Sequence, residues 1–131
     1  MTDAPQSKLF TPIKLAGLEL WNRIVVAPMC QYSAVDGNMT DWHMQHLGSL
    51  ANSGAGLVIA EATGVEMEGR ISHGCPALAT DEHEAAMKRV VDACKSFGTA
   101  AMGIQLGHAG RKASAQRPWE GGGSLKAEAW E

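Results

Sequence analysis

Three short apolar runs, separated by longer amphipathic segments, dominate the pattern of this chain. The runs cover residues 24–28, 56–60 and 100–106, and nearly all of their side chains are apolar. Continuous apolar runs of this length are typical of parallel strands buried on both faces, because neither face of such a strand meets water. The pattern therefore predicts three buried parallel strands.

Two amphipathic segments between these runs are predicted to be helices. The first covers residues 42–53, with Thr40 or Asp41 as its N-cap. The second covers residues 81–97, where apolar side chains recur at helical spacing and the first residue stands at capping-box spacing from Glu84. The resulting order of alternating strands and helices predicts right-handed crossovers in an α/β fold.

The lengths of the connections indicate which end of the sheet carries function. Helix-to-strand links are short, at residues 54–55 and 98–99, whereas the loops that follow the strands run over residues 29–40, over residues 62–80 and from residue 107 onward. Active sites of parallel α/β folds lie at the carboxyl ends of the strands, within such loops. Before the first strand, residues 9–20 read as a small β-hairpin around Ala16-Gly17.

Composition narrows the classes of ligand. The 131 residues are 45% hydrophobic and carry a net charge of −3, without a basic cluster of the kind that binds nucleic acid or anionic membranes. Cys30, Cys75 and Cys94 are odd in number and widely spaced, which argues against a disulfide scaffold and against a zinc knuckle. Together with a leader that lacks a signal-peptide pattern, they favour a cytoplasmic protein with a small-molecule ligand.

Several side chains at the strand ends could carry chemistry. Pro28 ends the first strand, so Cys30 and Tyr32 are expected at the rim where ligands bind; the alternative is that Cys30 is a small buried hydrophobic residue. Gln105 is the single amide in the third run, and a buried amide needs polar partners. His43 and His46 have the spacing of a metal pair, but packing is the favoured interpretation because no further ligand accompanies them.

Colinear motifs extend this picture over most of the chain. These motifs are Asn22-Arg23-Ile24-Val25-Val26-Ala27-Pro28-Met29-Cys30-Gln31-Tyr32, Asp41-Trp42-His43, Glu61-Ala62-Thr63, Glu68-Gly69-Arg70-Ile71 and Gln105-Leu106-Gly107-His108-Ala109-Gly110-Arg111-Lys112. Together they resemble the Old Yellow Enzyme family of FMN-dependent ene-reductases. The cysteine after Pro-Met, with a tyrosine two residues later, resembles the thermophilic-like class of that family.

The resemblance implies a TIM (β/α)8 barrel, of which this chain supplies the N-terminal hairpin and about the first three β-α steps. Residues 1–8 are then a polar leader, and residues 9–131 are the N-terminal part of one barrel domain that ends in the loop after strand three. Such a piece is expected to need a complementary C-terminal part of the barrel and to be inactive alone. A homo-oligomer is compatible with these features.

The resemblance also implies roles for individual residues. FMN would be contacted by the ends of the three strands, and the substrate by two loop residues. Cys30 and Tyr32 are the candidate catalytic residues, Cys30 as a modulator of the flavin, and no metal is expected. The implied cofactor-binding residues are Pro28, Met29, Cys30, Ala62 and Gln105, and the implied substrate-binding residues are Tyr32 and Ile71.

The implied reaction is reduction of the C=C bond of an α,β-unsaturated carbonyl compound, an enone or enal, with NADPH or NADH as the hydride donor. The family's substrate-oxygen clamp, proton donor and phosphate-binding loops come later in such chains. Two alternatives stay open from the residues alone: a small flavodoxin-like module that binds a nucleotide or flavin, and a non-catalytic fragment that completes another chain.

Overall fold

The computed structural model describes residues 7–126 and residue 130, so most of the predicted leader lies outside the described residues. A three-stranded parallel sheet is its centre, in the order β3-β4-β5, with β3 at Val25–Val26, β4 at Leu57–Gly64 and β5 at Ala101–Gly107. The parallel sheet and its alternation with helices confirm the predicted α/β arrangement.

The hairpin precedes this sheet as β1 (Ile13–Leu15) and β2 (Leu18–Leu20), which pair antiparallel. Its first strand is shorter than the apolar pattern indicates, because residues Lys8–Phe10 form the 3-10 helix η1 instead of continuing the strand. The hydroxyl of Ser7 accepts from the N–H of Leu9 at 3.4 Å at the start of this turn. Pro12, which lacks an N–H, separates it from β1.

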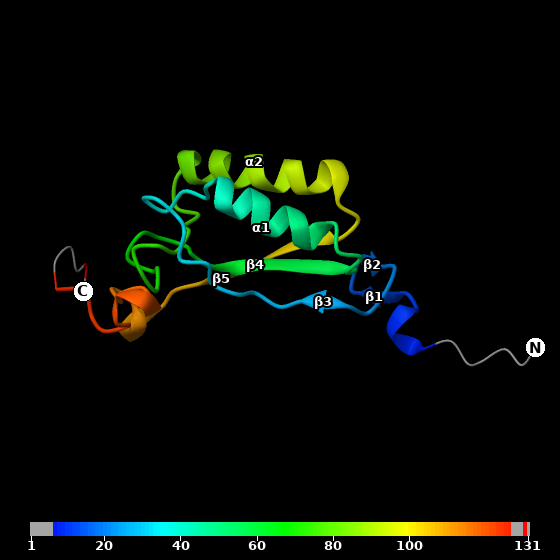
Figure 1. The fold of residues 1–131 in the computed structure, drawn as a ribbon, viewed down its shortest axis with the longest axis horizontal. Coiled ribbons are helices and arrows are strands. Elements are labelled where there is room, and N and C mark those ends of the chain that lie inside the picture. Colours follow the sequence, from blue (N-terminus) through cyan, green and yellow to red (C-terminus); the bar gives the residue numbers. More distant parts are fainter. Residues whose placement is uncertain (1–6, 127–129, 131) are drawn as a thin grey trace, which may run out of the picture.

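Both helices, α1 (Asp41–Ala51) and α2 (Asp81–Phe97), cover the same face of the sheet (Figure 1). Thr40 is the N-cap of α1, as predicted. For α2 the N-cap is Thr80 rather than Asp81, because the Thr80 hydroxyl accepts from the N–H of His83 at 3.3 Å. A threonine hydroxyl three residues before that N–H has the usual geometry of an N-cap.

The hydrophobic core lies between the sheet and these helices. Val58 and Ala60 from β4 meet Leu47 and Ala51 from α1, and Val90 from α2 completes the contact; each of these side chains is at most 5% exposed. The core fixes the direction of each sheet residue, because alternate residues of a strand point to opposite faces. Residues that alternate with Val58 therefore point away from the helices.

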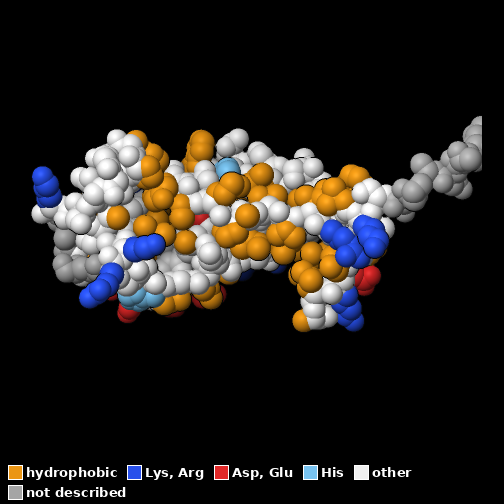
Figure 2. Space-filling view, turned by 90° about the horizontal axis from the view of Figure 1, so that it is seen from below, with side chains coloured by type: hydrophobic (Ala, Val, Ile, Leu, Met, Phe, Trp, Pro, Cys, Tyr) orange, Lys and Arg blue, Asp and Glu red, His pale blue; other side chains and the backbone are white. Residues whose placement is uncertain are grey.

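The opposite face of the sheet carries apolar side chains that no described helix covers (Figure 2). Val25 pairs with Leu57 in the parallel register, and both lie on this face together with Ile59. Val25 is 45% exposed. The strands were expected to be buried on both faces. Within the described residues they are buried on the helix side alone.

The strand bounds differ from the apolar runs at two places. β3 contains two residues instead of five, and its ladder ends before Pro28. β4 continues to Gly64, past the polar Glu61 and Thr63. After β5 the described residues form two 3-10 helices, η2 (Gly110–Lys112) and η3 (Pro118–Glu120). No helix among the described residues has the length and apolar character needed to span a bilayer.

Candidate functional site

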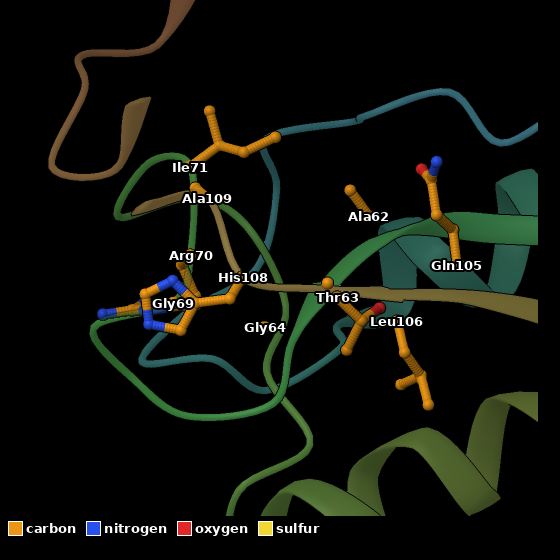
Figure 3. A pocket seen from close by; sticks show the side chains of 11 residues that line it. Ala62, Thr63, Gly64, Gly69, Arg70, Ile71, Gln105, Leu106, His108 and Ala109 are labelled. Atoms are coloured by element: carbon orange, nitrogen blue, oxygen red, sulfur yellow. The ribbon is translucent and has the colours of Figure 1, made fainter. Parts of the chain in front are cut away.

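The carboxyl ends of β4 and β5 form an open pocket of about 240 Å³ (Figure 3). Small-molecule sites usually enclose about 300–1,000 Å³, so this pocket has room for one edge of a cofactor-sized ligand. It lies at the sheet edge that the long loops predicted. Its lining comprises Ala62, Thr63, Gly64, Gly69, Arg70, Ile71, Gln105, Leu106, Gly107, His108 and Ala109.

A β-bulge at Glu61 decides which residues face this pocket. Ala60 pairs with Ile104 and Ala62 pairs with Gln105, so Glu61 is an extra residue without a partner in β5. Bulges of this kind re-aim side chains and are common beside active sites. As a consequence Ala62 shares a sheet face with Gln105, whereas the side chain of Glu61 is buried on the helix side.

Gln105 is exposed in the described residues, so the prediction that its amide is buried is wrong. The reason is the register of β5: Met102 and Ile104 pack against the core, and Gln105 therefore points to the face that no described helix covers. Its amide projects on the same side as Ala62 (Figure 3). A primary amide at this position offers two N–H donors and one carbonyl acceptor to a ligand.

Beneath the loop that follows β3, Glu61 is held by a buried polar network. Its Oε2 accepts a hydrogen bond from the backbone N–H of Gln31 at 2.9 Å, and its Oε1 lies 3.3 Å from Nε2 of His43. The backbone N–H of Thr40 donates to Nδ1 of His43 at 2.9 Å. In a neutral ring this places the imidazole proton on Nε2, facing the carboxylate.

His43 and His46 do not converge on a common ligand. His43 faces Glu61, whereas the ring of His46 stacks on Trp42 with centroids 6.3 Å apart and planes 7° apart. Burial lowers the pKa of His46 below its ordinary value. The structure thus supports the packing interpretation of this pair.

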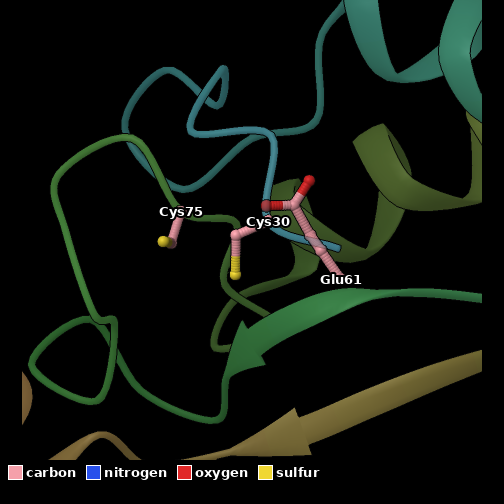
Figure 4. Close-up of side chains that lie close together, drawn as sticks. All are labelled: Cys30, Glu61 and Cys75. Carbon is pink, nitrogen blue, oxygen red and sulfur yellow. The ribbon is translucent and has the colours of Figure 1, made fainter. Parts of the chain in front are cut away.

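Two cysteines join Glu61 in a compact cluster (Figure 4). The sulfurs of Cys30 and Cys75 and a carboxylate oxygen of Glu61 all lie within 4.8 Å of one another. Cys30 follows β3, Glu61 is in β4, and Cys75 lies in the loop after β4, so three separate segments meet here. Cys75 is fully buried and Cys30 is partly exposed.

The two thiols influence each other's ionisation. A hydrogen bond from the S–H of Cys30 is the main cause that lowers the pKa of Cys75 to about 6, and hydrogen bonds from Ser72 act in the same direction. The Ser72 hydroxyl lies 3.4 Å from the Cys75 sulfur. The contact with Cys75, followed by burial, raises the pKa of Cys30 well above its ordinary value. The contact between the two thiols therefore favours the loss of one proton from the pair and the retention of the other.

We expect the first thiol proton of this pair to be lost near pH 6, below the ordinary value of 9. In Cys30→Ala the donor is gone while burial beside Glu61 remains, so the midpoint should rise by about one pH unit or more. Thiolate absorbance in the ultraviolet, recorded during a pH titration, measures both. Cys94→Ala, which leaves the cluster intact, should keep the low midpoint; a first transition at pH 9 in the unmodified protein would contradict the assignment.

The candidate residues at the end of strand one and in the loop after it, three assigned to the flavin and Tyr32 to the substrate, lie outside the pocket. Pro28, Met29, Cys30 and Tyr32 are not among its lining residues. Tyr32 adopts a left-handed backbone conformation with φ of 54°, and its ring meets the ring of Trp119 edge-on at 5.9 Å between centroids. The structure thus brings Cys30 to Glu61 and Cys75 rather than to Gln105.

Of the two residues that the resemblance assigns to the substrate, Ile71 lines the pocket. Arg70 also lines it and is only 8% exposed, so its guanidinium group is largely withdrawn from solvent. Its Nε donates to the carbonyl of Met67 at 2.9 Å and its Nη1 to the carbonyl of His73 at 3.3 Å. Arg70 therefore shapes the loop after β4.

Comparison with known proteins identifies the relatives of this arrangement. A sequence profile of the NADH:flavin oxidoreductase / NADH oxidase family matches residues 8–126. The NADPH dehydrogenase of Listeria welshimeri is 52% identical over 109 residues, which are 82% of this chain and 32% of that protein. The chain thus spans about a third of the length of the curated relatives it matches.

Two solved structures share the fold. Morphinone reductase in complex with tetrahydroNAD superposes with a TM-score of 0.74 and 33% identity, over 83% of this chain and 29% of that chain. Old Yellow Enzyme from Pichia sp. AKU4542 superposes with a TM-score of 0.74 and 28% identity, over 82% of this chain and 28% of that chain. Both similarities extend over more than four fifths of this chain.

Proposed function

Because this chain belongs to the NADH:flavin oxidoreductase / NADH oxidase family, we propose that it is part of an FMN-dependent ene-reductase. Its fold is that of part of the family's TIM (β/α)8 barrel, to which it contributes the hairpin, three parallel strands and the two helices between them. The proposed reaction is reduction of the C=C bond of an enone or enal, with NADPH or NADH as hydride donor. The proposed location is the reducing cytoplasm, where free thiols persist.

One observation carries this proposal: a single pocket at the carboxyl ends of β4 and β5 brings together Ala62, Gln105 and Ile71. The resemblance implies that each of these three residues contacts the flavin or the substrate. The residues at the strand ends that line the pocket have small side chains or none, namely Ala62, Gly64 and Gly107. A flat ring could therefore approach the backbone there. The pocket's volume fits one edge of such a ring, and the remainder of the site would come from the complementary part of the barrel.

The residues present are chemically suited to FMN. The flavin pyrimidine edge carries alternating N–H and C=O groups, which match the donors and acceptor of the Gln105 amide. When bound, FMN accepts a hydride from the nicotinamide and passes it to the substrate's β-carbon. Ala62, Pro28 and Met29 would hold the ring by main-chain and van der Waals contact. The chain's own contribution is orientation, and near-attack positioning can supply several kcal/mol of a barrier.

Cys30 is proposed to tune the flavin as a hydrogen-bond donor at its electron-accepting edge. Such hydrogen bonds stabilise the reduced form. The S–H of Cys30 also interacts with the Cys75 sulfur, so the flavin and Cys75 would share one weak donor. This role is modulatory and does not require Cys30 to act as a nucleophile.

Tyr32 and Ile71 are proposed to contact the substrate. Ile71 supplies apolar surface at the pocket. The Tyr32 ring is fixed by Trp119, and its phenol could reach the activating carbonyl oxygen of an enone. Burial raises the pKa of Tyr32, which keeps the phenol protonated and able to donate a hydrogen bond at neutral pH.

The test is the Cys30→Ala variant of the flavin-loaded protein. We expect the midpoint potential of the flavin to become more negative while FMN stays bound, because one weak donor contributes little to total affinity. Potentiometric titration with absorbance detection measures the potential, and the flavin-to-protein absorbance ratio measures occupancy.

Cys94→Ala is the matched control, since Cys94 is a buried thiol in α2 away from the pocket. It should leave the potential unchanged. If Cys30→Ala also leaves the potential unchanged and only lowers thermal stability, Cys30 is a packing residue and its flavin role is wrong.

A further inference from the structure

The cluster of Cys30, Cys75 and Glu61 has features that a flavin contact does not explain. Cys75 and Glu61 are at most 4% exposed, yet a polar atom of each lies within 4.8 Å of the sulfur of the partly exposed Cys30. Figure 4 shows the three side chains gathered in this small region. Two sulfurs and one carboxylate oxygen are a ligand set for a soft or borderline divalent cation. Within the described residues this is the one group with ligand atoms so close together.

The spacing of the three ligand atoms is compatible with a bound metal ion. Two thiolates bound tetrahedrally at about 2.3 Å from a zinc ion stand about 3.8 Å apart. The cluster's ligand atoms already lie within 4.8 Å of one another, so the site needs only a small closure. A disulfide requires the sulfurs to approach to about 2.05 Å, a larger movement for the fully buried Cys75.

The surroundings of the ligands are those of an organised metal site. Carboxylate ligands are usually held by further hydrogen bonds, and Glu61 receives one from the backbone N–H of Gln31 while His43 lies against its other oxygen. The Nε2 atom of His43 is buried beside Glu61 but makes no well-aligned hydrogen bond. Ser72 holds the sulfur of Cys75 from the other side.

We propose that Cys30, Glu61 and Cys75 form a binding site for a thiophilic divalent cation such as Zn²⁺ or Cd²⁺, with one tetrahedral position left for water. Binding forms two metal–sulfur bonds and one metal–oxygen bond and releases the remaining thiol protons to solvent. The three ligands are complete without FMN, so the site does not require the flavin. A cation-bound Cys30 has lost its S–H, however, so cation binding and the proposed hydrogen bond from Cys30 to the flavin exclude each other.

The experiment titrates Cd²⁺ into the reduced, flavin-free protein and follows the ultraviolet thiolate-to-cadmium charge-transfer absorbance. We expect saturation at one equivalent. Cys75→Ser and Glu61→Gln should each weaken binding by roughly tenfold or more, because each removes one ligand. Zn²⁺ should displace Cd²⁺ and abolish the signal. Cys94→Ser, which removes a thiol outside the cluster, should bind as the unmodified protein does.

A second measurement on the unmodified protein guards against variants that fail to fold. Alkylation followed by peptide mapping should show that Zn²⁺ slows modification of Cys30 and Cys75, with Cys94 reporting on any global unfolding. Equal alkylation of Cys30 with and without Zn²⁺, or Cd²⁺ binding that persists unchanged in folded Cys75→Ser, would overturn the proposal. Flavin binding and potential are not read in either assay, so the proposed function stands or falls separately.

Discussion

Replacing Glu61 by alanine should lower the free energy of unfolding by about 1–3 kcal/mol for each buried donor that loses its acceptor. The side chains of Glu61 and His43 are 3% and 1% exposed, so the variant leaves a buried imidazole facing an apolar methyl group. The backbone N–H of Gln31 also loses its acceptor. Chemical denaturation, followed by far-ultraviolet circular dichroism, measures the change.

Glu66→Ala is the matched control, because Glu66 pairs with a histidine through the same atoms on the surface. Its Oε1 lies 2.8 Å from Nε2 of His108, with side chains 58% and 43% exposed. Exposed pairs contribute about 0–1 kcal/mol, so this variant should unfold almost as the unmodified protein does. Equal destabilisation by the two substitutions would show that burial of the Glu61 pair has no special energetic role.

Replacing Gln105 by alanine should weaken FMN binding by roughly tenfold or more. The amide is proposed to pair with the polar edge of the flavin, and leaving those groups unpaired in the assembled site costs about 1–3 kcal/mol. Fluorescence quenching of FMN, titrated with the flavin-free protein together with the rest of the barrel, measures the dissociation constant.

Gln45→Ala removes a similar amide from an exposed position on α1, outside the pocket, and should leave the dissociation constant unchanged. The same titration with Tyr32→Phe should also retain FMN, while the KM for an enone rises. A Gln105→Ala protein that binds FMN as tightly as the Gln45→Ala control would remove Gln105 from the proposed site.

The spacing of apolar residues along the sequence predicted the main helices and strands, because it reflects which side chains are buried. The stripe of apolar residues in 81–97 is the face of α2 that packs on the core, and the run 56–60 is the start of β4. The pocket's position was also predictable, since loop lengths reveal the carboxyl edge of a parallel sheet. The identification of Ala62, Ile71 and Gln105 as neighbours followed from the resemblance.

The cluster could not be predicted in the same way. A bulge such as the one at Glu61 depends on the register between two strands, which the apolar pattern of one strand does not contain. The only local signal was a carboxylate directly after a continuous apolar run. Cys75 lies in the long loop after β4, and its distance from Cys30 depends on how that loop folds back. Contacts between distant segments fix this path, such as the hydrogen bond from the N–H of Ala34 to the carbonyl of Gly74 at 2.9 Å.

The bulge places a functional side chain in β4 without using a position of the strand pairing. Glu61 occupies no rung of the ladder, and each neighbour in β4 from Leu57 to Gly64 keeps its own partner in β5. A chain lacking this one residue could retain the same strand pairing and the same pocket face. The carboxylate thus ties the strand to the loop after β3 and to α1 without taking part in the strand pairing, so its removal should cost stability while the register of the sheet is kept.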